Sequence, residues 1–431
     1  MKTINGSDII ILDGGLGSTI EDTYKQDITR TPLWSAKPIQ ENPELVVDAH
    51  LAFLRAGAEI ILTSTYQCSR ETFEQSGYTP EEGAQIMQRS VKLADDARNA
   101  FLDERGKETV GSAGKSEVFV ALSFGPFGST LQPPQDFDGF YPPPFGPTAP
   151  SSSSPSPSPD SRDHGNTRLF SSDPTTNAGE ETAAIEALAG FHLWRLRAVR
   201  SNDEAWDAVD YVAFETVPHL REVRAIKVAM ARFFADLLPS TTTTTTTTTG
   251  GSNKPLKGWW ISLVFPNGAE STQWGSKERH HQTQSLLGPE CPPTEEGDIL
   301  TVLLDETLGA VPTGFGINCT RIDSYPSILS SIISNSKFAS SEAGPDGRPV
   351  PLTLVVYPNG GRLGDTFDGL THRWVSDGKR RADGRNITWE EEVVEIVQKC
   401  RGDWKDVIVG GCCRVYPPQI KTLREKVKEA L

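Results

Sequence analysis

Three cysteines lie in two short motifs that could hold a metal ion. Cys319 stands between an asparagine and a threonine, whereas Cys412 and Cys413 are adjacent and follow Gly410-Gly411, a pair that permits a sharp turn. Three thiolates suit zinc and leave its fourth tetrahedral position open, as in catalytic rather than structural sites. The pattern predicts one Zn²⁺ per chain. Two other interpretations are that the cysteines are small buried core residues, or that the adjacent pair forms a vicinal disulfide.

Two acidic residues occur in similar positions, each directly after an apolar run. Asp13 precedes Gly14-Gly15, and Glu215 precedes a threonine. A carboxylate at such a place binds a cation or acts as an acid or base. Alternatively, Asp13 is a turn residue and Glu215 is a charge favoured near a helix N-terminus. Together with the three thiolates, the two acids predict a pocket for a molecule with a thiol at one end and an ammonium at the other.

Eight apolar runs of strand length would position these residues. They are residues 9–12, 59–63, 118–123, 211–214, 259–264, 314–317, 352–357 and 407–409. Apolar residues three and four apart predict helices between several runs and one after the last, at 43–56, 80–102, 183–199, 219–237, 390–399 and 418–431. Near-continuous apolar strands that alternate with helices are typical of a parallel sheet covered by helices.

The count of eight favours an α/β fold of the (β/α)8 TIM-barrel type. Such barrels keep their active sites at the C-terminal ends of the strands, where polar or glycine residues follow nearly every run in this chain. An open doubly wound sheet is the alternative, but Gly14-Gly15-Leu16-Gly17 lacks the spacing of a dinucleotide-binding motif. In a closed barrel Cys319 and Cys412-Cys413 lie at one rim with a single strand between them.

The length of 431 residues is compatible with one barrel domain that carries insertions, so residues 1–431 are predicted as a single domain. Apolar residues make up only 36% of the chain, which also has 38 glycines and 31 prolines, so part of it should not pack into a core. We expect disordered, low-complexity insertions at 132–182, 239–254 and 275–297.

The charge balance points to small-molecule substrates. A net charge of -15 argues against nucleic acid or an anionic membrane surface as partner. The sequence contains neither a membrane-spanning apolar stretch nor a signal-peptide pattern at its start, which predicts a cytoplasmic location. Six cysteines in so long a chain are too sparse for a disulfide framework. Nothing in the pattern indicates the oligomeric state.

Seven motifs spread along the chain resemble those of the homocysteine S-methyltransferase family, and the two cysteine motifs are the most specific. The motifs are Leu12-Asp13-Gly14-Gly15-Leu16-Gly17, Thr65-Tyr66-Gln67, Gly125-Pro126-Phe127-Gly128, Phe214-Glu215-Thr216-Val217-Pro218, Gly316-Ile317-Asn318-Cys319-Thr320, Tyr357-Pro358-Asn359-Gly360-Gly361 and Gly410-Gly411-Cys412-Cys413-Arg414.

The resemblance implies a (β/α)8 barrel with zinc held by Cys319, Cys412 and Cys413 and with the sulfur of homocysteine as fourth ligand. It also implies that Asp13 and Glu215 bind the ammonium group of homocysteine and that neighbouring residues contact the substrate. The full set of implied substrate-binding residues is Asp13, Gly14, Gly15, Thr65, Glu215 and Asn318. No protein nucleophile is needed, because the substrate thiolate itself attacks the methyl group.

The residues of the Thr65-Tyr66-Gln67 and Tyr357-Pro358-Asn359 motifs resemble one branch of the family more than the other. They are closer to the branch that uses a sulfonium donor, S-methylmethionine or S-adenosylmethionine, than to the branch that uses betaine. The chain departs from the family on the donor side, in the segment 131–141, at Gly360 and at Val415-Tyr416. The donor preference is therefore the least determined part of the expectation.

Other functions are compatible with the same residues. A barrel hydrolase could use the open zinc position to activate water, although such sites normally use histidine and carboxylate ligands. A non-catalytic zinc or redox barrel is a second alternative. A zinc methyltransferase with a different thiol or selenol acceptor is a third.

Overall fold

The computed structural model describes residues 9–28, 31–108, 118–147, 174–237, 256–266, 299–334, 350–360, 365–368, 373–376 and 387–430. The expected insertions at 239–254 and 275–297 lie outside the described residues, as does 148–173 from the first insertion. The remaining parts of that insertion, 132–147 and 174–182, are described and are ordered in secondary structure or turns.

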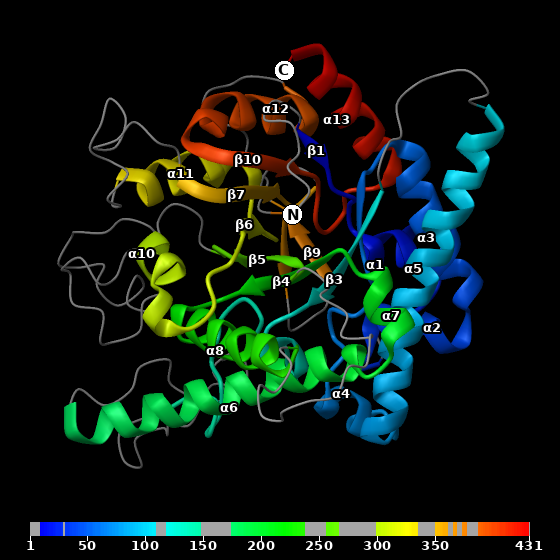
Figure 1. Ribbon diagram of the computed structural model, residues 1–431. Helices are drawn as coiled ribbons and strands as arrows, with labels where there is room; N and C mark the ends of the chain where they lie inside the picture. The colour runs from blue at the N-terminus through cyan, green and yellow to red at the C-terminus, as the bar shows by residue number, and fades with distance from the viewer. Residues whose placement is uncertain are drawn as a thin grey trace, which may run out of the picture.

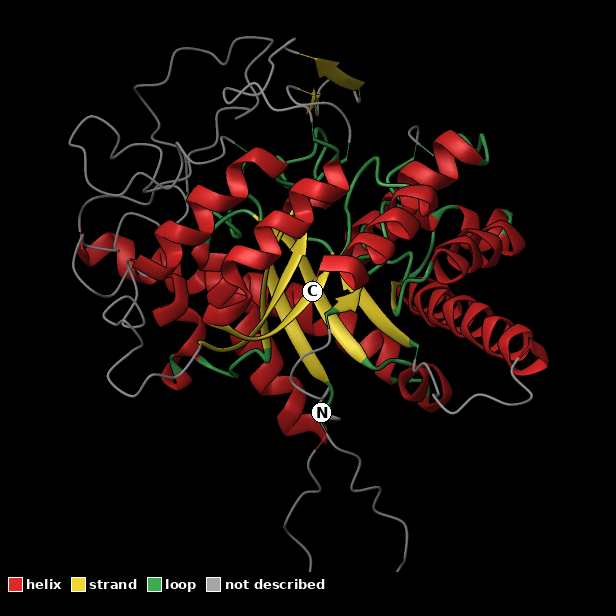
Figure 2. Cartoon of the chain, turned by 90° about the horizontal axis from the view of Figure 1, so that it is seen from above, coloured by secondary structure: helices red, strands yellow, loops and turns green. Residues whose placement is uncertain are grey.

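Eight parallel strands form one sheet in the order β1-β10-β7-β6-β5-β4-β3-β2. Their bounds are β1 Ile10–Ile11, β2 Ile60–Leu62, β3 Phe119–Phe124, β4 Tyr211–Val217, β5 Gly258–Leu263, β6 Gly314–Asn318, β7 Val350–Tyr357 and β10 Trp404–Val409. A parallel bridge between Leu12 and Ile60 joins the two ends of the sheet. The strands therefore close into a barrel surrounded by helices, visible from two directions in Figures 1 and 2, and the predicted fold and all eight predicted strands are confirmed.

All six predicted helices are present in the surrounding layer, which also contains helices that the pattern did not predict, among them Ile299–Leu304 and Tyr325–Ser334. The longer ones are α3 Pro43–Ala56, α5 Pro80–Glu108, α6 Pro174–Arg200, α8 Leu220–Leu237, α11 Tyr325–Ser334, α12 Trp389–Cys400 and α13 Pro417–Ala430. Shorter elements are α1 Leu16–Ser18 with the π-turn Thr19–Thr23, α2 Pro38–Glu41, α4 Arg70–Gln75, α7 Asp203–Ala208 and α10 Ile299–Leu304, and an antiparallel pair β8 Asp365–Asp368 and β9 Arg373–Ser376 lies outside the barrel sheet. None of the described helices is long and apolar enough to cross a bilayer.

Local signals fix several helix ends. Helix α3 has Pro43 in its first turn and ends at Gly57, which adopts a left-handed φ of 103° that suits glycine. Helix α12 begins with a capping box, in which Thr388 and Glu391 each bond the other's backbone N–H.

The segment 132–147 is a correction to the expected disorder. Its Tyr141 is fully buried, and Phe127, just before the segment, stacks on Phe145 with ring centroids 3.8 Å apart. Helix α6 likewise begins at Pro174, nine residues before the predicted start at 183. Proline-rich composition predicted disorder, but aromatic side chains bury enough apolar surface to hold the segment 132–147 on the barrel.

Both faces of the strands are buried, which explains their continuous apolar sequence. Within β1, Ile10 belongs to the cluster inside the barrel, whereas Ile11 packs outward under the helices. In β7, Val355 faces inward and Leu354 faces outward in the same way. Successive side chains of a strand point to opposite faces, so a closed barrel covered by helices buries most of them, with exposed residues only near the strand starts, at Pro351 and Lys405.

The seam between β1 and β10 depends on a glycine. A Cβ atom on Gly410 would lie 2.6 Å from the backbone oxygen of Asp13 and 2.7 Å from the Cβ of Leu12. We expect Gly410→Ala to lower the free energy of unfolding by about 1–3 kcal/mol, because backbone must shift to admit the methyl group. Chemical denaturation measures this, and Gly106→Ala in α5 is the control, since a Cβ there meets no atom within 4 Å. Equal stability of Gly410→Ala and the parent would contradict the close approach.

Candidate active site and metal centre

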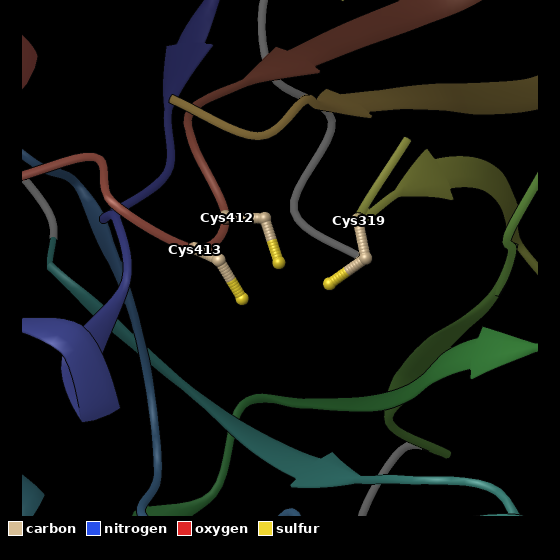
Figure 3. Close-up of side chains that lie close together, drawn as sticks. All are labelled: Cys319, Cys412 and Cys413. Atoms are coloured by element: carbon tan, nitrogen blue, oxygen red, sulfur yellow. The ribbon is translucent and has the colours of Figure 1, made fainter. Parts of the chain in front are cut away.

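The three cysteines of the two motifs converge at one rim of the barrel. Cys319 follows β6 directly, and Cys412 and Cys413 lie just after β10. Their three Sγ atoms all lie within 4.8 Å of one another, and they form the group of potential metal ligands found among the described residues. Figure 3 shows the sulfurs of Cys412 and Cys413 side by side, with that of Cys319 facing them from the opposite side.

The adjacent cysteines share one site because the chain has left the strand and is turning. The N–H of Val415 donates to the carbonyl of Cys412 at 3.1 Å, which closes the turn. The N–H of Cys412 donates to Pro358 O at 2.9 Å, and the N–H of Gly411 donates to Asp13 O at 2.9 Å. The turn is thus fixed from the end of β7 on one flank and from the end of β1 on the other.

Backbone strain concentrates at this rim. Thr216, Cys319 and Arg414 have positive φ values of 59°, 47° and 59°, a conformation that is uncommon for residues other than glycine. Such residues persist only where the surroundings hold them, and they cluster at functional sites.

Asn318 bonds one of these strained residues, Thr216, and contacts one of the cysteines. Its side chain accepts a bond from the N–H of Thr216 and donates to the Thr216 hydroxyl, both at 2.8 Å. The same amide nitrogen lies 3.9 Å from the Sγ of Cys412 as a donor. Asn318 therefore joins the ends of β4 and β6 and orients one of the three sulfurs.

The three sulfurs fit a tetrahedral zinc site. Sulfurs bound to zinc at about 2.3 Å are roughly 3.8 Å apart in a tetrahedron, which is compatible with three sulfurs that all lie within 4.8 Å of one another. Hydrogen bonds from Cys319 and Cys412 hold the pKa of Cys413 well below its ordinary value. Bonds with the other two thiols, together with burial, raise the pKa of Cys319 well above its ordinary value. The cluster therefore carries one thiolate readily, and a cation is needed to ionise all three.

Asp13 and Glu215 lie in the barrel mouth, buried and close enough for their charges to interact. Asp13 Oδ2 accepts from the N–H of Leu62 at 2.8 Å, whereas its buried Oδ1 has no hydrogen-bond partner among the described residues. Glu215 accepts from the hydroxyl of Ser123. Burial raises the pKa of Asp13 well above its ordinary value and raises the pKa of Glu215 to about 8. Two desolvated acids with an unused oxygen suit a cationic group of a ligand.

The other predicted substrate contacts are placed at the same rim but with their polar groups engaged. The hydroxyl of Thr65 donates to Ser123 O at 2.7 Å. A Cβ on Gly15 would lie 2.7 Å from Cys412 O, and one on Gly14 would lie 2.4 Å from Val415 O. The two glycines therefore allow the cysteine turn to approach β1, which is the contact that the structure shows for them.

Two further hydrogen-bonded pairs lie near the cysteines and the two acids: Tyr357 with Ser262, and Tyr66 with Asp136. Tyr357 bonds Ser262 at 2.6 Å inside the barrel and interacts with Glu215. Tyr66 donates its hydroxyl to Asp136 Oδ2 at 3.1 Å. The two tyrosines stand in the motifs quoted above, which could have identified them, whereas Asp136 lies within the segment expected to be disordered and carries no local signal.

The role of Asn318 leads to a prediction about metal affinity. We expect Asn318→Ala to weaken zinc binding about 10- to 100-fold, as is usual when a group that orients a metal ligand is removed. Competition with a chromogenic chelator measures the affinity. Asn99→Ala, on the exposed side of α5, is the matched control. Unchanged affinity would mean that the amide does not orient Cys412.

Comparisons with known proteins agree with this geometry. A family model described as "Homocysteine S-methyltransferase" matches residues 10–427. Homocysteine S-methyltransferase 2 from Arabidopsis thaliana is 25% identical over 423 residues, which cover 97% of this chain and 92% of the relative. Betaine-homocysteine S-methyltransferase from Drosophila melanogaster is 26% identical over 423 residues and covers 97% and 94%.

A solved structure has the same fold. The metallated form of the homocysteine methyltransferase MmuM from Escherichia coli superposes with a TM-score of 0.55 at 20% identity, covering 97% of each chain.

Proposed function

The chain belongs to the homocysteine S-methyltransferase family and is a methyltransferase, and from this premise we propose that it methylates L-homocysteine with a sulfonium donor to form methionine. The donor is S-methylmethionine or S-adenosylmethionine, and one Zn²⁺ per chain is the cofactor. The observation that carries the proposal is the convergence of the Cys319, Cys412 and Cys413 sulfurs beside two buried carboxyl groups.

The residues of the rim divide into two sets by their chemistry. Cys319, Cys412 and Cys413 would hold the zinc, which when bound supplies a Lewis acid that lowers the pKa of the homocysteine thiol and orients its sulfur. Asp13 and Glu215 bind the homocysteine ammonium, which satisfies the free Oδ1 of Asp13 and offsets the burial of both carboxylates.

The reaction is a single in-line displacement. The proton of the homocysteine thiol passes to solvent, and an electron pair of the thiolate sulfur forms a bond to the methyl carbon of the donor. The bond between that carbon and the donor sulfur breaks, and its electron pair stays on the donor sulfur, which becomes a neutral thioether. The protein contributes no nucleophile, and it accelerates the reaction by holding the two sulfurs in line and excluding water.

Methionine formation by the purified, zinc-loaded protein tests the proposal. Homocysteine is supplied with S-methylmethionine, S-adenosylmethionine or betaine as sole donor. Methionine from either sulfonium compound supports the proposal and ranks the donors. Methionine from betaine alone would refute the sulfonium assignment, and no methionine with one zinc per chain confirmed would refute homocysteine as the acceptor.

We also propose that the protein acts in the cytoplasm on these small molecules, with neither nucleic acid nor membrane as partner. The acidic net charge of -15 supports this, because a phosphate backbone or an anionic lipid surface would repel it.

A further inference from the structure

A third acidic residue near the cysteine cluster, Asp136, lies in the segment 125–147, which follows β3. Asp136 is near enough to Cys412 and Cys413 for their charges to interact, although the segment comes from the other side of the barrel mouth. Asp13 and Glu215 already provide two carboxylates for the single ammonium of homocysteine. Asp136 is therefore available for a second cationic group.

The position of Asp136 is fixed by direct contacts. The Tyr66 hydroxyl donates to its Oδ2 at 3.1 Å. Tyr66 is itself held against the segment, because the N–H of Gly125 donates to Tyr66 O at 3.0 Å and a Cβ on Gly125 would lie 2.9 Å from the tyrosine ring. Gly128 allows the chain to fold back, since a Cβ there would lie 2.7 Å from the backbone nitrogen of Asp136.

A buried ionic group beneath the segment holds it in place before any ligand arrives. Glu222 of α8 is fully buried and accepts from the N–H of Phe127 at 2.7 Å and from the Tyr141 hydroxyl at 2.6 Å. Burial raises the pKa of Glu222, but the hydrogen bonds with His192 and Tyr141, together with His219 nearby, outweigh it, so the pKa lies below its ordinary value. Glu222 is therefore a carboxylate at neutral pH and a strong acceptor for the segment.

From these contacts we propose that Asp136 binds the ammonium group of the methyl donor and so selects sulfonium donors that carry an amino-acid head. The assignment rests on the proposed function. The ammonium is the better partner than the sulfonium, because the sulfonium charge disappears during transfer and a carboxylate beside it would stabilise the substrate more than the transition state. An ammonium keeps its charge throughout, so Asp136 contributes to binding and not to the chemical step.

The experiment pairs a variant with a shortened donor. Asp136→Asn is compared with the parent, using S-methylmethionine and 3-(dimethylsulfonio)propanoate, which has the same sulfonium but no ammonium. We expect the KM for S-methylmethionine to rise about 10- to 100-fold in the variant, the loss of one charge-assisted bond, with kcat nearly unchanged. The KM for the shortened donor, the KM for homocysteine and the zinc content should stay as in the parent.

Two further variants complete the design. Glu186→Gln removes a carboxylate that pairs with Arg232 at the surface of α6, and it should leave every parameter as in the parent, which separates a contact from a general charge effect. Tyr66→Phe keeps the carboxylate of Asp136 but removes the hydroxyl that donates to it. This variant should show a smaller rise in the KM for S-methylmethionine than Asp136→Asn.

The outcomes separate the assignment from the function. Methionine formation by the parent together with an unchanged donor KM in Asp136→Asn would overturn the assignment alone. The same conclusion follows if the KM values for S-methylmethionine and for the shortened donor rise equally in the variant, or if the KM for homocysteine rises instead. No methionine from the parent with either donor would overturn the proposed function and the assignment with it.

Discussion

Replacement of Cys412 by alanine is expected to abolish zinc retention and methionine formation together. Cys412, Cys413 and Cys319 would be three of four ligands, with the fourth position kept for the substrate, and among the described residues the group of potential ligands contains no further member to replace a lost sulfur. The same result is expected for Cys319→Ala and Cys413→Ala. Metal content after gel filtration, measured by mass spectrometry, and methionine formation from homocysteine are the two readouts.

The matched control is Cys400→Ala. Cys400 is a buried cysteine that lies at the end of α12 and is not part of the metal-ligand group. This variant should retain one zinc per chain and the parental turnover. Full activity in a zinc-free Cys412→Ala protein would refute the metal-dependent mechanism, and loss of zinc in the control would show that retention reports on folding and not on the ligands.

The second large effect is expected at the two acids of the barrel mouth. Asp13→Asn and Glu215→Gln should each raise the KM for homocysteine about 10- to 100-fold, because each removes a charged partner of the substrate ammonium from a desolvated site. Zinc should remain bound, since the three sulfurs are untouched. Steady-state kinetics with varied homocysteine at saturating donor measure the effect.

An exposed acid provides the comparison. Glu186→Gln in α6 removes a carboxylate that pairs with Arg232 at the surface, and it should leave the kinetics unchanged. If Asp13→Asn and Glu215→Gln also left the KM for homocysteine unchanged, the two residues would have no place in substrate binding. Loss of zinc in either would instead assign them to the support of the metal site.

The barrel was predictable because its signals are local. Each strand is a short apolar run that ends in polar or glycine residues, and eight such runs alternating with helices favoured the closed barrel that the bridge between Leu12 and Ile60 completes. The cysteine cluster followed from the same reasoning, since Cys319 and Cys412 end strands β6 and β10 that are separated only by β7. The family resemblance inferred from the motifs is likewise confirmed by the match to residues 10–427.

The parts that sequence reasoning missed depend on partners far away in the chain. Tyr141 is ordered by Glu222, 81 residues later, and Asp136 is held by Tyr66, 70 residues earlier. No local pattern reveals such pairs, so a proline-rich stretch looked disordered. The helices α10 and α11 were not predicted either. A few apolar residues beside a polar stretch do not distinguish a helix from a strand.

Asn318 shows the same limit within the site itself. The family resemblance implied contact with the substrate, and the structure shows in addition that its amide is bonded to Thr216 and lies near the sulfur of Cys412. Sequence reasoning placed the residue at the right rim but could not give the direction of its side chain.

The hydrogen bonds that flank the cysteine turn set an order of events during synthesis. The turn with Cys412 and Cys413 takes its shape from Asp13 in the first strand of the barrel and from Pro358 after β7, so it forms only when β10 has entered the seam. A nascent chain on the ribosome can display Cys319 long before it has this turn. A metal ion that needs all three sulfurs would therefore be captured late, by a barrel that has already closed.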